Sequence, residues 1–548
     1  MPSRSRNARP AAPARAFPGD RFWLPLLPLL TLLAALVHLP SFLRPVWNPD
    51  EGFLATQARM LAAGGVLYDT VVDRKPPLLP WLYQGAFAVF GDDSLRPLRC
   101  AAVAAHVVTA ALLAALARRR WGDRWGAAAG AAYVLLSVGL APEDTQAASF
   151  EVFALPWTAA AVLLADRRRW GLAGLAVAGA ALTKQTGAAV LLPVAWSLWQ
   201  AGRAAPSSSS SSGLRLRTLT PSWAAGRADG MLLRAAAGPG ALPRPGRGAA
   251  GGGALGRYAA GTAGAWGRLL AGCALPVAVV AAATGTRHFV FWTLTGSSTY
   301  MSPQGAWLLG AGRGLGNAAI LLAAGAGLLV PALWWALRRR RFADADLWVW
   351  LVGSVCAVVA GFQFYGHYYL QLLPPLVLIG IAAVRALPSR GPARRLAAAW
   401  TLLAAAVFTA WGLAAPRAEL DHAQAVAAAV RDRSGPRDTV LLWGMHPEQY
   451  WLADRAPACR YLTAGFLTNF SGGRGGARVG ARYAVPGAWD VLREEFAGAP
   501  PALVVDDSRG APYGAAAVPE FRDLLAQGGY TRVGTVDGAV LYARRGRG

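Results

Sequence analysis

Long apolar segments separated by short arginine-rich ones are the feature that most limits how this chain can fold. Stretches of roughly 17–25 mostly apolar residues are long enough to cross a bilayer as helices. A backbone inside lipid must satisfy its own hydrogen bonds, so helices are expected rather than an open sheet. Only 15% of the 548 residues are charged and 55% are hydrophobic, which is less charge than a soluble domain usually carries. We therefore predict a mainly α, polytopic membrane bundle of about eleven transmembrane helices. The predicted helices cover residues 22–42, 97–117, 126–141, 150–165, 170–183, 186–200, 266–284, 315–337, 346–364, 369–386 and 396–415.

The arginine clusters predict which ends of these helices face the cytoplasm. Lys and Arg are enriched in the cytoplasmic loops of membrane proteins. The basic N-terminus and the later clusters all fall on one side, which we assign to the cytoplasm; the clusters are Arg118 to Arg120, Arg167 to Arg169, residues 201–265, Arg338 to Arg341 and Arg390 to Arg395. The other, extracytoplasmic face then holds residues 43–96, 142–149, 285–306, 365–368 and everything after 416. The richness in Ala, Gly, Arg and Pro suggests a GC-rich bacterial genome, so we expect a bacterial plasma membrane.

The net charge of +25 does not indicate a nucleic-acid partner. Proteins that bind nucleic acid carry their basic residues as a patch or stripe on a soluble surface. The arginines of this chain lie mainly between apolar segments, where the positive-inside rule places them. We therefore expect contacts with membrane lipids and none with nucleic acid.

Composition divides the chain into three parts. Residues 1–21 form a basic cytoplasmic N-terminus, and residues 22–415 form the transmembrane domain. That domain is interrupted at 201–265 by a Ser-, Gly-, Pro- and Arg-rich tract, which predicts a flexible cytoplasmic linker. In residues 416–548, helix-like and strand-like segments alternate, which predicts a small extracytoplasmic α/β domain. The helix-like segments are 417–433, 489–497 and 519–527, and the strand-like ones are 439–443, 502–506 and 530–544.

The first outer loop, residues 43–96, is the most informative segment. Asn48 is a favourable N-cap and Pro49 suits the first position of a helix. Asp50 and Glu51 then occupy the first turn of a helix that we expect to be amphipathic and to lie at the membrane surface. Acidic residues in a first turn also simply suit the helix dipole, so a structural role for this pair stays open. The predicted apolar face consists of Phe53, Leu54, Met60 and Leu61.

Lysine is nearly absent from the chain. Of its 54 basic residues only Lys75 and Lys184 are lysine, and 52 are arginine. A lysine that survives such a bias indicates a need for a compact ammonium, for example against phosphate; two chance survivors are the alternative. Both lysines map to the outer face. Lys75 precedes Pro76-Pro77, and proline restricts the residue before it to extended backbone, so the direction of Lys75 should be fixed.

These residues together resemble the GT-C fold transferases that use polyprenyl-phosphate sugars, a group that includes the protein O-mannosyltransferases and the transferase that adds aminoarabinose to lipid A. The resemblance rests on the order of four weak motifs over roughly residues 22–386. They are Asp50-Glu51, Lys75-Pro76-Pro77, Thr183-Lys184 and the segment from Tyr368-Tyr369-Leu370 to Leu373-Pro374.

The resemblance implies an inverting transfer of a sugar from a polyprenyl-phosphate donor to a hydroxyl of a lipid, protein or glycan acceptor. Asp50 is then the general base on that hydroxyl. The donor phosphate is expected to be bound by Lys75, Arg74, Lys184 and Arg287. Candidate contacts to the acceptor or to a cation are Glu51, Glu143, Asp144, Glu151 and His367.

One departure from the family bears on metal binding. In the lipid A enzyme an acidic residue implicated in metal binding precedes Lys-Pro-Pro, whereas Arg74 stands there in this chain. A metal site of that kind is therefore in doubt, although Glu143, Asp144 and Glu151 could hold a divalent cation. No other cofactor is expected.

Two other function classes compete with a transferase. A multi-pass lipid or solute transporter would explain many helices, but it predicts internal repeats with broken helices in matching positions, and no convincing repeat is present. A structural membrane protein whose outer domain binds a partner would leave the segment Arg74-Lys75-Pro76-Pro77 unexplained.

Overall fold

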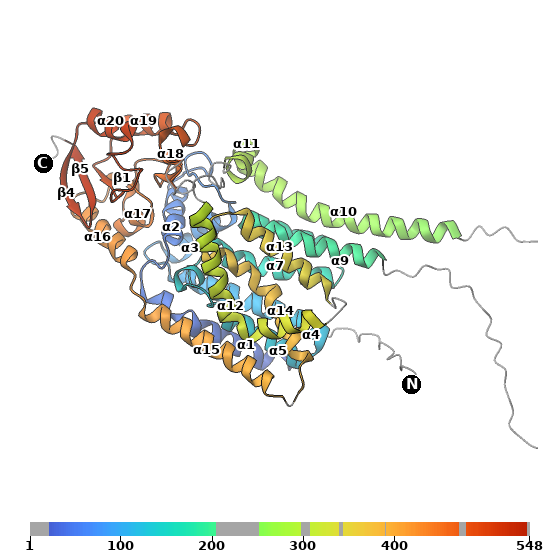
Figure 1. The fold of residues 1–548 in the computed structure, drawn as a ribbon. Coiled ribbons are helices and arrows are strands. Elements are labelled where there is room, and N and C mark those ends of the chain that lie inside the picture. Colours follow the sequence, from blue (N-terminus) through green and yellow to red (C-terminus); the bar gives the residue numbers. More distant parts are fainter. Residues whose placement is uncertain are drawn as a thin grey trace, which may run out of the picture.

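The computed structural model describes residues 21–203, 251–296, 307–338, 344–389, 391–470 and 478–544. Figure 1 shows a large bundle of helices with a smaller domain of strands and short helices, coloured orange to red, at one end. The predicted N-terminal part, residues 1–21, and most of the predicted linker, residues 204–250, lie outside the described residues except for residue 21.

In the part of the chain that the structure describes, eleven apolar helices overlap the eleven predicted segments. They are α1 (Trp23–Val37), α4 (Arg96–Trp121), α5 (Asp123–Leu136), α7 (Phe150–Asp166), α8 (Trp170–Thr183), α9 (Leu191–Arg203), α10 (Gly251–Ala283), α12 (Trp307–Arg338), α13 (Ala345–Ala360), α14 (Leu373–Ala386) and α15 (Pro392–Ala414). Within the described residues, five helical segments are both long and apolar enough to cross a membrane, and four apolar helices are shorter. The prediction of a polytopic, mainly α membrane protein is confirmed.

Several helix boundaries differ from the prediction, and the largest differences are the starts of α12 and α10. The helix predicted at 315–337 begins earlier, at Trp307, as α12. Its polar first turns are stabilised by the α13–α14 connection, because Arg313 donates to the carbonyl of Gln363 at 2.7 Å and Asn317 to that of Phe364 at 2.9 Å. The helix predicted at 266–284 also begins earlier, so residues 251–265 of the predicted linker are helical in α10. The glycine-rich composition of this segment had predicted a flexible linker instead of a helix.

Shorter helical segments lie between these helices along the chain. They are η1 (Leu39–Leu43), α2 (Pro49–Ala62), α3 (Leu78–Phe90), α6 (Pro142–Thr145), η2 (Gln185–Val190), α11 (Thr286–Val290), η3 (Phe291–Thr295) and η4 (Gly366–Leu372). As predicted, Asn48 caps α2, since its side chain accepts a hydrogen bond from the Asp50 backbone at 2.9 Å. However, α2 does not lie on the lipid surface. Residues on all its sides are buried, because it packs between α3 and α17 (Glu448–Ala453) of the C-terminal part.

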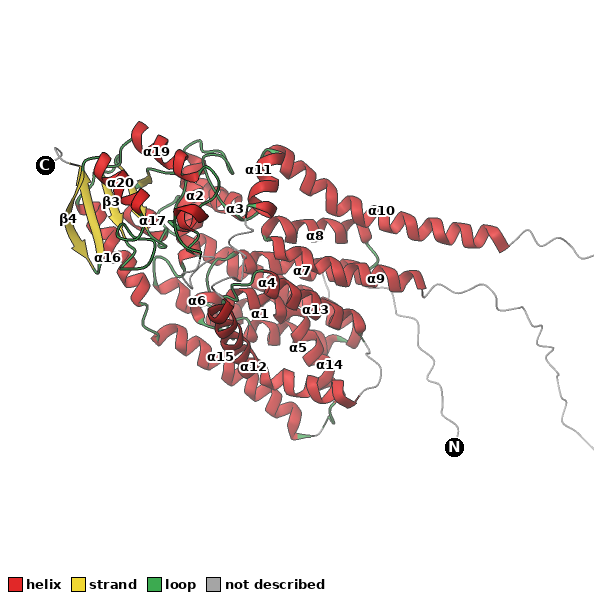
Figure 2. Cartoon of the chain, turned by 45° about the horizontal axis from the view of Figure 1, so that its top comes forward, coloured by secondary structure: helices red, strands yellow, loops and turns green. Residues whose placement is uncertain are grey.

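The C-terminal part contains one five-stranded sheet, visible in yellow in Figure 2. Its elements are α16 (Ala418–Asp432), β1 (Thr439–Trp443), α17, β2 (Ala456–Pro457), α18 (Gly465–Thr468), η5 (Ala481–Tyr483), α19 (Ala488–Gly498), β3 (Leu503–Asp506), α20 (Pro519–Gln527), β4 (Tyr530–Val536) and β5 (Ala539–Arg544). The strand order is β2-β1-β3-β5-β4; β1 runs parallel to β2 and β3, and β5 runs antiparallel to β3 and β4. The predicted small α/β fold is confirmed.

The sheet orients its loops toward the bundle. Ligand sites in open α/β sheets form beyond the carboxyl ends of parallel strands. Here the loop after β1 carries Met445 and Pro447, and both residues line a cavity that the bundle shares. The C-terminal part therefore supplies a wall of that cavity.

Candidate active site between the bundle and the C-terminal domain

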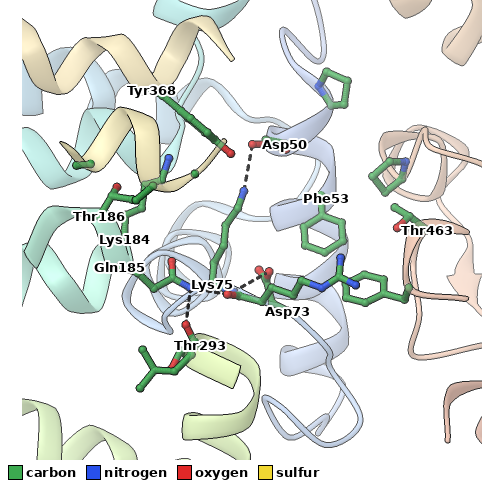
Figure 3. A pocket seen from close by; sticks show the side chains of 18 of the residues that line it. Asp50, Phe53, Asp73, Lys75, Lys184, Gln185, Thr186, Thr293, Tyr368 and Thr463 are labelled. Carbon is green, nitrogen blue, oxygen red and sulfur yellow. Dashed lines mark hydrogen bonds and ion pairs between the residues drawn. The ribbon is translucent and has the colours of Figure 1, made fainter. Parts of the chain in front are cut away.

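A cavity of about 580 Å³ lies where the first outer loop, the bundle and the C-terminal part meet. Its charged and polar side chains project inward from opposite sides (Figure 3). Small and apolar residues of α13, namely Cys356, Ala357 and Ala360, also line the cavity, as does Leu294 of η3. The lining residues that carry the argument are Asp50, Asp73, Arg74, Lys75, Lys184, Gln185, Tyr368, Met445, Thr463 and Phe466.

Asp50 and Lys75 form an ion pair inside this cavity. The Lys75 Nζ lies 3.2 Å from the Asp50 Oδ2, and both side chains remain about one-third exposed. Burial alone raises the pKa of Asp50, but the charge of Lys75, their hydrogen bond and the charges of His367 and Lys184 outweigh it, so the pKa falls below its ordinary value. Asp50 is therefore an ionised carboxylate at neutral pH, able to accept a proton and reachable by a ligand.

The backbone of Lys75 is held on both sides. Its N–H donates to the Asp73 Oδ1 at 3.1 Å, and its carbonyl accepts from the Tyr68 hydroxyl at 2.9 Å. Its ammonium also lies 4.2 Å from the centre of the Phe150 ring, a favourable cation–π distance. The segment before Pro76-Pro77 thus presents Lys75 in one direction, toward α2.

Lys184 enters the cavity from the other side, at the junction of α8 and η2. Its ammonium stacks on the ring of Tyr368 at 3.9 Å and forms an ion pair with Glu151, whose side chain is buried. The structure places Tyr368, from the last of the four motifs, in the cavity wall. The two lysines of the chain, 109 positions apart in sequence, thus line one site.

Glu51 has a different role from its neighbour Asp50. Its side chain is fully buried and pairs with buried Arg99 at 2.8 Å. Its carboxylate also accepts hydrogen bonds from the backbone N–H of Trp47 and of Ala148, each at 2.8 Å. The prediction that Glu51 contacts an acceptor or a cation is wrong, because every face of this carboxylate is occupied by protein.

The remaining predicted site residues do not line the cavity. Arg287 is exposed on α11, so the prediction that it binds the donor phosphate has no geometric support. Glu143 is largely exposed and pairs with Arg417 at 3.4 Å. Asp144 and Glu151 both face His367, whose Nδ1 lies 2.7 Å from Asp144 and whose Nε2 lies 3.7 Å from Glu151. Glu151 thus pairs with Lys184, and His367 joins Glu151 to Asp144 outside the cavity lining.

The carboxylates proposed as cation ligands do not converge on one point. Glu143, Asp144 and Glu151 are engaged by Arg417, His367 and Lys184 respectively. Among the described residues, no group of three or more His, Cys, Asp or Glu side chains has the arrangement of a metal site. The arrangement of these carboxylates therefore does not fit a divalent cation.

Two kinds of cavity residue were missed from the sequence. Asp73 lines the cavity and directly precedes the Arg74-Lys75 pair, so its position in that motif could have revealed it. Thr463 and Phe466 come from the C-terminal part, and the sequence contains no signal that links them to the first loop. Arg74 makes that link, since its guanidinium lies 4.5 Å from the centre of the Phe466 ring.

Gln185 connects three segments of the cavity wall through hydrogen bonds. Its amide donates to the carbonyl of Arg74 at 2.5 Å and to that of Thr293 at 3.1 Å. Figure 3 shows these bonds running from η2 to the first loop and to η3. Asp73, Arg74 and Lys75 are consequently fixed relative to Lys184. Arg74, Lys75 and Lys184 place positive charge beside the two carboxylates that line the cavity, and Glu151 offsets the charge of Lys184.

Comparison with known proteins supports the predicted resemblance. Residues 74–210 match the model of the dolichyl-phosphate-mannose-protein mannosyltransferase family, about a quarter of the chain. No curated protein sequence matches. The fold is similar to that of ArnT from Cupriavidus metallidurans bound to undecaprenyl phosphate, with a TM-score of 0.58 at 15% identity, covering 96% of this chain and 99% of that one.

The same relative in its apo state gives a TM-score of 0.56 at 15% identity, covering 95% of this chain and 97% of that one. The archaeal oligosaccharyltransferase AglB from Archaeoglobus fulgidus gives 0.47 at 13% identity, covering 96% and 74%. The GT-C type of fold, with a membrane bundle and a small C-terminal sheet, is therefore confirmed over nearly the whole chain.

Proposed function

We propose that this chain, a membrane protein of the GT-C fold, is a glycosyltransferase that takes a sugar from a polyprenyl-phosphate donor. The observation that carries the proposal is the Asp50–Lys75 pair in a cavity that Lys184 also enters. A carboxylate able to accept a proton and two ammonium groups able to bind phosphate are the groups that such a transfer needs. The matching family model and the ArnT-like fold favour this function over the transporter alternative.

The transfer is an inverting displacement. The acceptor oxygen attacks the anomeric carbon and forms the new glycosidic bond as its proton passes to Asp50. The bond from that carbon to the phosphate oxygen breaks, and the polyprenyl phosphate leaves with the electron pair. Lys75 and Lys184 stabilise the charge on the leaving phosphate, while Arg74, next to Phe466, lines the same cavity farther toward the C-terminal domain.

The same proposal specifies the donor, the acceptor and the orientation of the protein in the membrane. The donor carries a hexosyl or pentosyl group on an undecaprenyl- or decaprenyl-type lipid, and the acceptor hydroxyl belongs to a lipid, a protein or a glycan of the cell envelope. The protein lies in a bacterial plasma membrane with its N-terminus in the cytoplasm. The C-terminal domain then lies outside the cytoplasm, beside the outer ends of the helices. The domain boundaries stay predictions.

The test compares membranes that contain the wild-type chain, Asp50→Asn or Glu143→Gln. Glu143 is a matched control, because it is a carboxylate on the same face that does not line the cavity. Each sample receives a panel of polyprenyl-phosphate sugars and nucleotide sugars with the cell envelope as acceptor, and products are followed by mass spectrometry.

We expect the wild type and Glu143→Gln to consume a lipid-linked sugar at similar rates. Asp50→Asn should be slower by roughly 100-fold or more, the usual effect of losing a general base. Consumption of nucleotide sugars instead of lipid-linked ones would contradict the donor class. Equal rates for all three proteins would contradict the role of Asp50 as base.

A further inference from the structure

The buried carboxyl of Asp73 has no role in the transfer described above. Its side chain is 3% exposed and lines the cavity. One oxygen, Oδ1, accepts from the Lys75 backbone. The other, Oδ2, is buried without a hydrogen-bond partner among the described residues. An ionised carboxylate with half its hydrogen-bonding capacity unused is costly to bury.

A second unpartnered acceptor lies beside it. The Gln57 Nε2 donates to the carbonyl of Val72 at 3.1 Å, which leaves the Gln57 Oε1 buried without a partner in the part of the chain that the structure describes. Gln57 is close enough to Asp73 for hydrogen bonding from its amide to favour the ionised carboxylate, which lowers the pKa of Asp73 and partly offsets the effect of burial. Exchanging the positions of the Gln57 amide oxygen and nitrogen would offer Asp73 an N–H donor. The Val72 carbonyl would then face the amide oxygen and lose its hydrogen bond. A proton on Asp73 removes the buried charge and turns the unpartnered side of the carboxyl into a hydrogen-bond donor.

The charges around Asp73 favour that proton. Burial is the largest influence and raises the pKa of Asp73; Lys75 and Gln57 lower it, Asp50 raises it, and the result is a pKa of about 6. The other groups that face it are Tyr68, whose charge interaction with Asp73 is also unfavourable, and Arg74 and Lys184 across the cavity. A phosphate anion bound in this cavity adds negative charge and raises the pKa of a nearby carboxyl further.

We propose that binding of a lipid phosphodiester in this cavity is coupled to uptake of one proton by Asp73. The inference rests on the proposed function, because a lipid phosphodiester is the donor class assigned there. Asp73 is a positioning residue in this role. Its Oδ1 fixes the backbone of Lys75, and its protonation removes a negative charge that otherwise competes with the donor phosphate for the Lys75 ammonium.

The experiment measures binding of undecaprenyl methyl phosphate to the purified full-length chain between pH 5 and 8. This sugar-free phosphodiester keeps one negative charge throughout that range, so its own titration cannot cause a pH dependence. The proteins are the wild type, Asp73→Asn and Asp69→Asn. An asparagine at 73 can still accept from the Lys75 N–H and carries no charge, so it imitates the protonated acid. Asp69 is a half-exposed carboxylate of the same loop and does not line the cavity.

We expect wild-type affinity to fall on the order of tenfold from pH 5 to pH 8. Asp73→Asn should keep the wild-type affinity of pH 5 at every pH, and Asp69→Asn should behave as the wild type. The same pH dependence in the wild type and Asp73→Asn would overturn the inference while leaving the proposed donor class intact. No binding at any pH by any of the three proteins would instead overturn the donor class, and the inference with it.

A second measurement needs no variant. Calorimetric titration of the wild type at pH 7, in buffers of different ionisation enthalpy, counts the protons that accompany binding. Uptake of a substantial fraction of one proton supports the coupling, and a count of zero overturns it.

Discussion

Gly52 lies so close to Glu448 that a Cβ on the glycine would stand 2.2 Å from the Cβ of the glutamate. Gly52 follows Asp50 by two positions in α2, and Glu448 begins α17 directly after Pro447, which lines the cavity. The backbone of α2, the helix that carries Asp50, therefore packs directly against Glu448 of the C-terminal domain. A side chain at position 52 would overlap the side chain of Glu448, so position 52 requires glycine where α2 meets α17.

Gly52→Ala should loosen this contact. The added methyl group must displace α17, and overpacking of this kind usually costs about 1–3 kcal/mol. We expect a lower unfolding temperature of the full-length protein in detergent and a lower rate of donor consumption, because the cavity wall at Met445 and Pro447 shifts. Gly85→Ala is the matched control, since that exposed helical glycine has no atom within 4 Å of its added Cβ. Equal behaviour of the two variants would contradict the tight contact.

Glu51→Gln should lower the stability of the protein, whereas Asp50→Asn should lower its activity. Glu51 is fully buried and paired with Arg99, and removing one partner of a buried ion pair typically costs about 3–5 kcal/mol. We therefore expect Glu51→Gln to lower the thermal stability strongly. Asp50 is partly exposed and faces the cavity, so Asp50→Asn should keep most of the stability and lose the activity. Thermal unfolding and donor turnover, measured on both variants, distinguish the two roles; a stable Glu51→Gln protein would refute the structural one.

Lys184→Met should reveal both a structural and a ligand-binding role of this lysine. It removes the Lys184 partner of buried Glu151 and leaves that carboxylate beside the His367 ring, 3.7 Å away, which we expect to cost about 3–5 kcal/mol. Adding Glu151→Gln should recover much of the lost stability, because the unpaired charge is then gone. Because we propose that Lys184 also contacts the donor phosphate, the stable double variant should bind undecaprenyl phosphate more weakly than the wild type does. Wild-type affinity in the stable double variant would limit Lys184 to a structural role.

His446 should make the stability of the C-terminal domain depend on pH. Burial lowers the pKa of His446, but its hydrogen bond to Glu448 and the charges of Glu448, Asp507 and Glu419 raise it above 6.5 overall. Arg509 and His422 also face this ring. A histidine with a raised folded-state pKa stabilises the fold fully below its unfolded pKa, and that stabilisation is lost as pH rises through the folded pKa.

Thermal unfolding at pH 6 and at pH 9 tests this sign. His446→Gln should lower the unfolding temperature more at pH 6 than at pH 9. His288→Gln, at an exposed histidine on α11, serves as the control and should have a small effect at both. A larger effect of His446→Gln at pH 9 would show that the ring is stabilising in its neutral form instead.

The positions of the membrane helices and of the C-terminal strands followed from local patterns. Long apolar segments have few alternatives to helices in lipid, and alternating helix-like and strand-like segments predicted the α/β domain. The cap on α2 was also local, because Asn48 bonds only two residues ahead. Hydropathy failed where tertiary contacts compensate polar residues, as at Arg313 in α12.

The sequence by itself determined the membrane bundle, the small C-terminal α/β fold and the two unusual lysines. It could not separate Asp50 from Glu51, because adjacent residues in a first helical turn look alike until their surroundings are known. Only the tertiary structure turned one toward Lys75 and the other toward Arg99. It also brought Asp73 beside Gln57 and Phe466 beside Arg74. Such contacts join segments far apart in the chain or depend on burial, and no local pattern of residues encodes either.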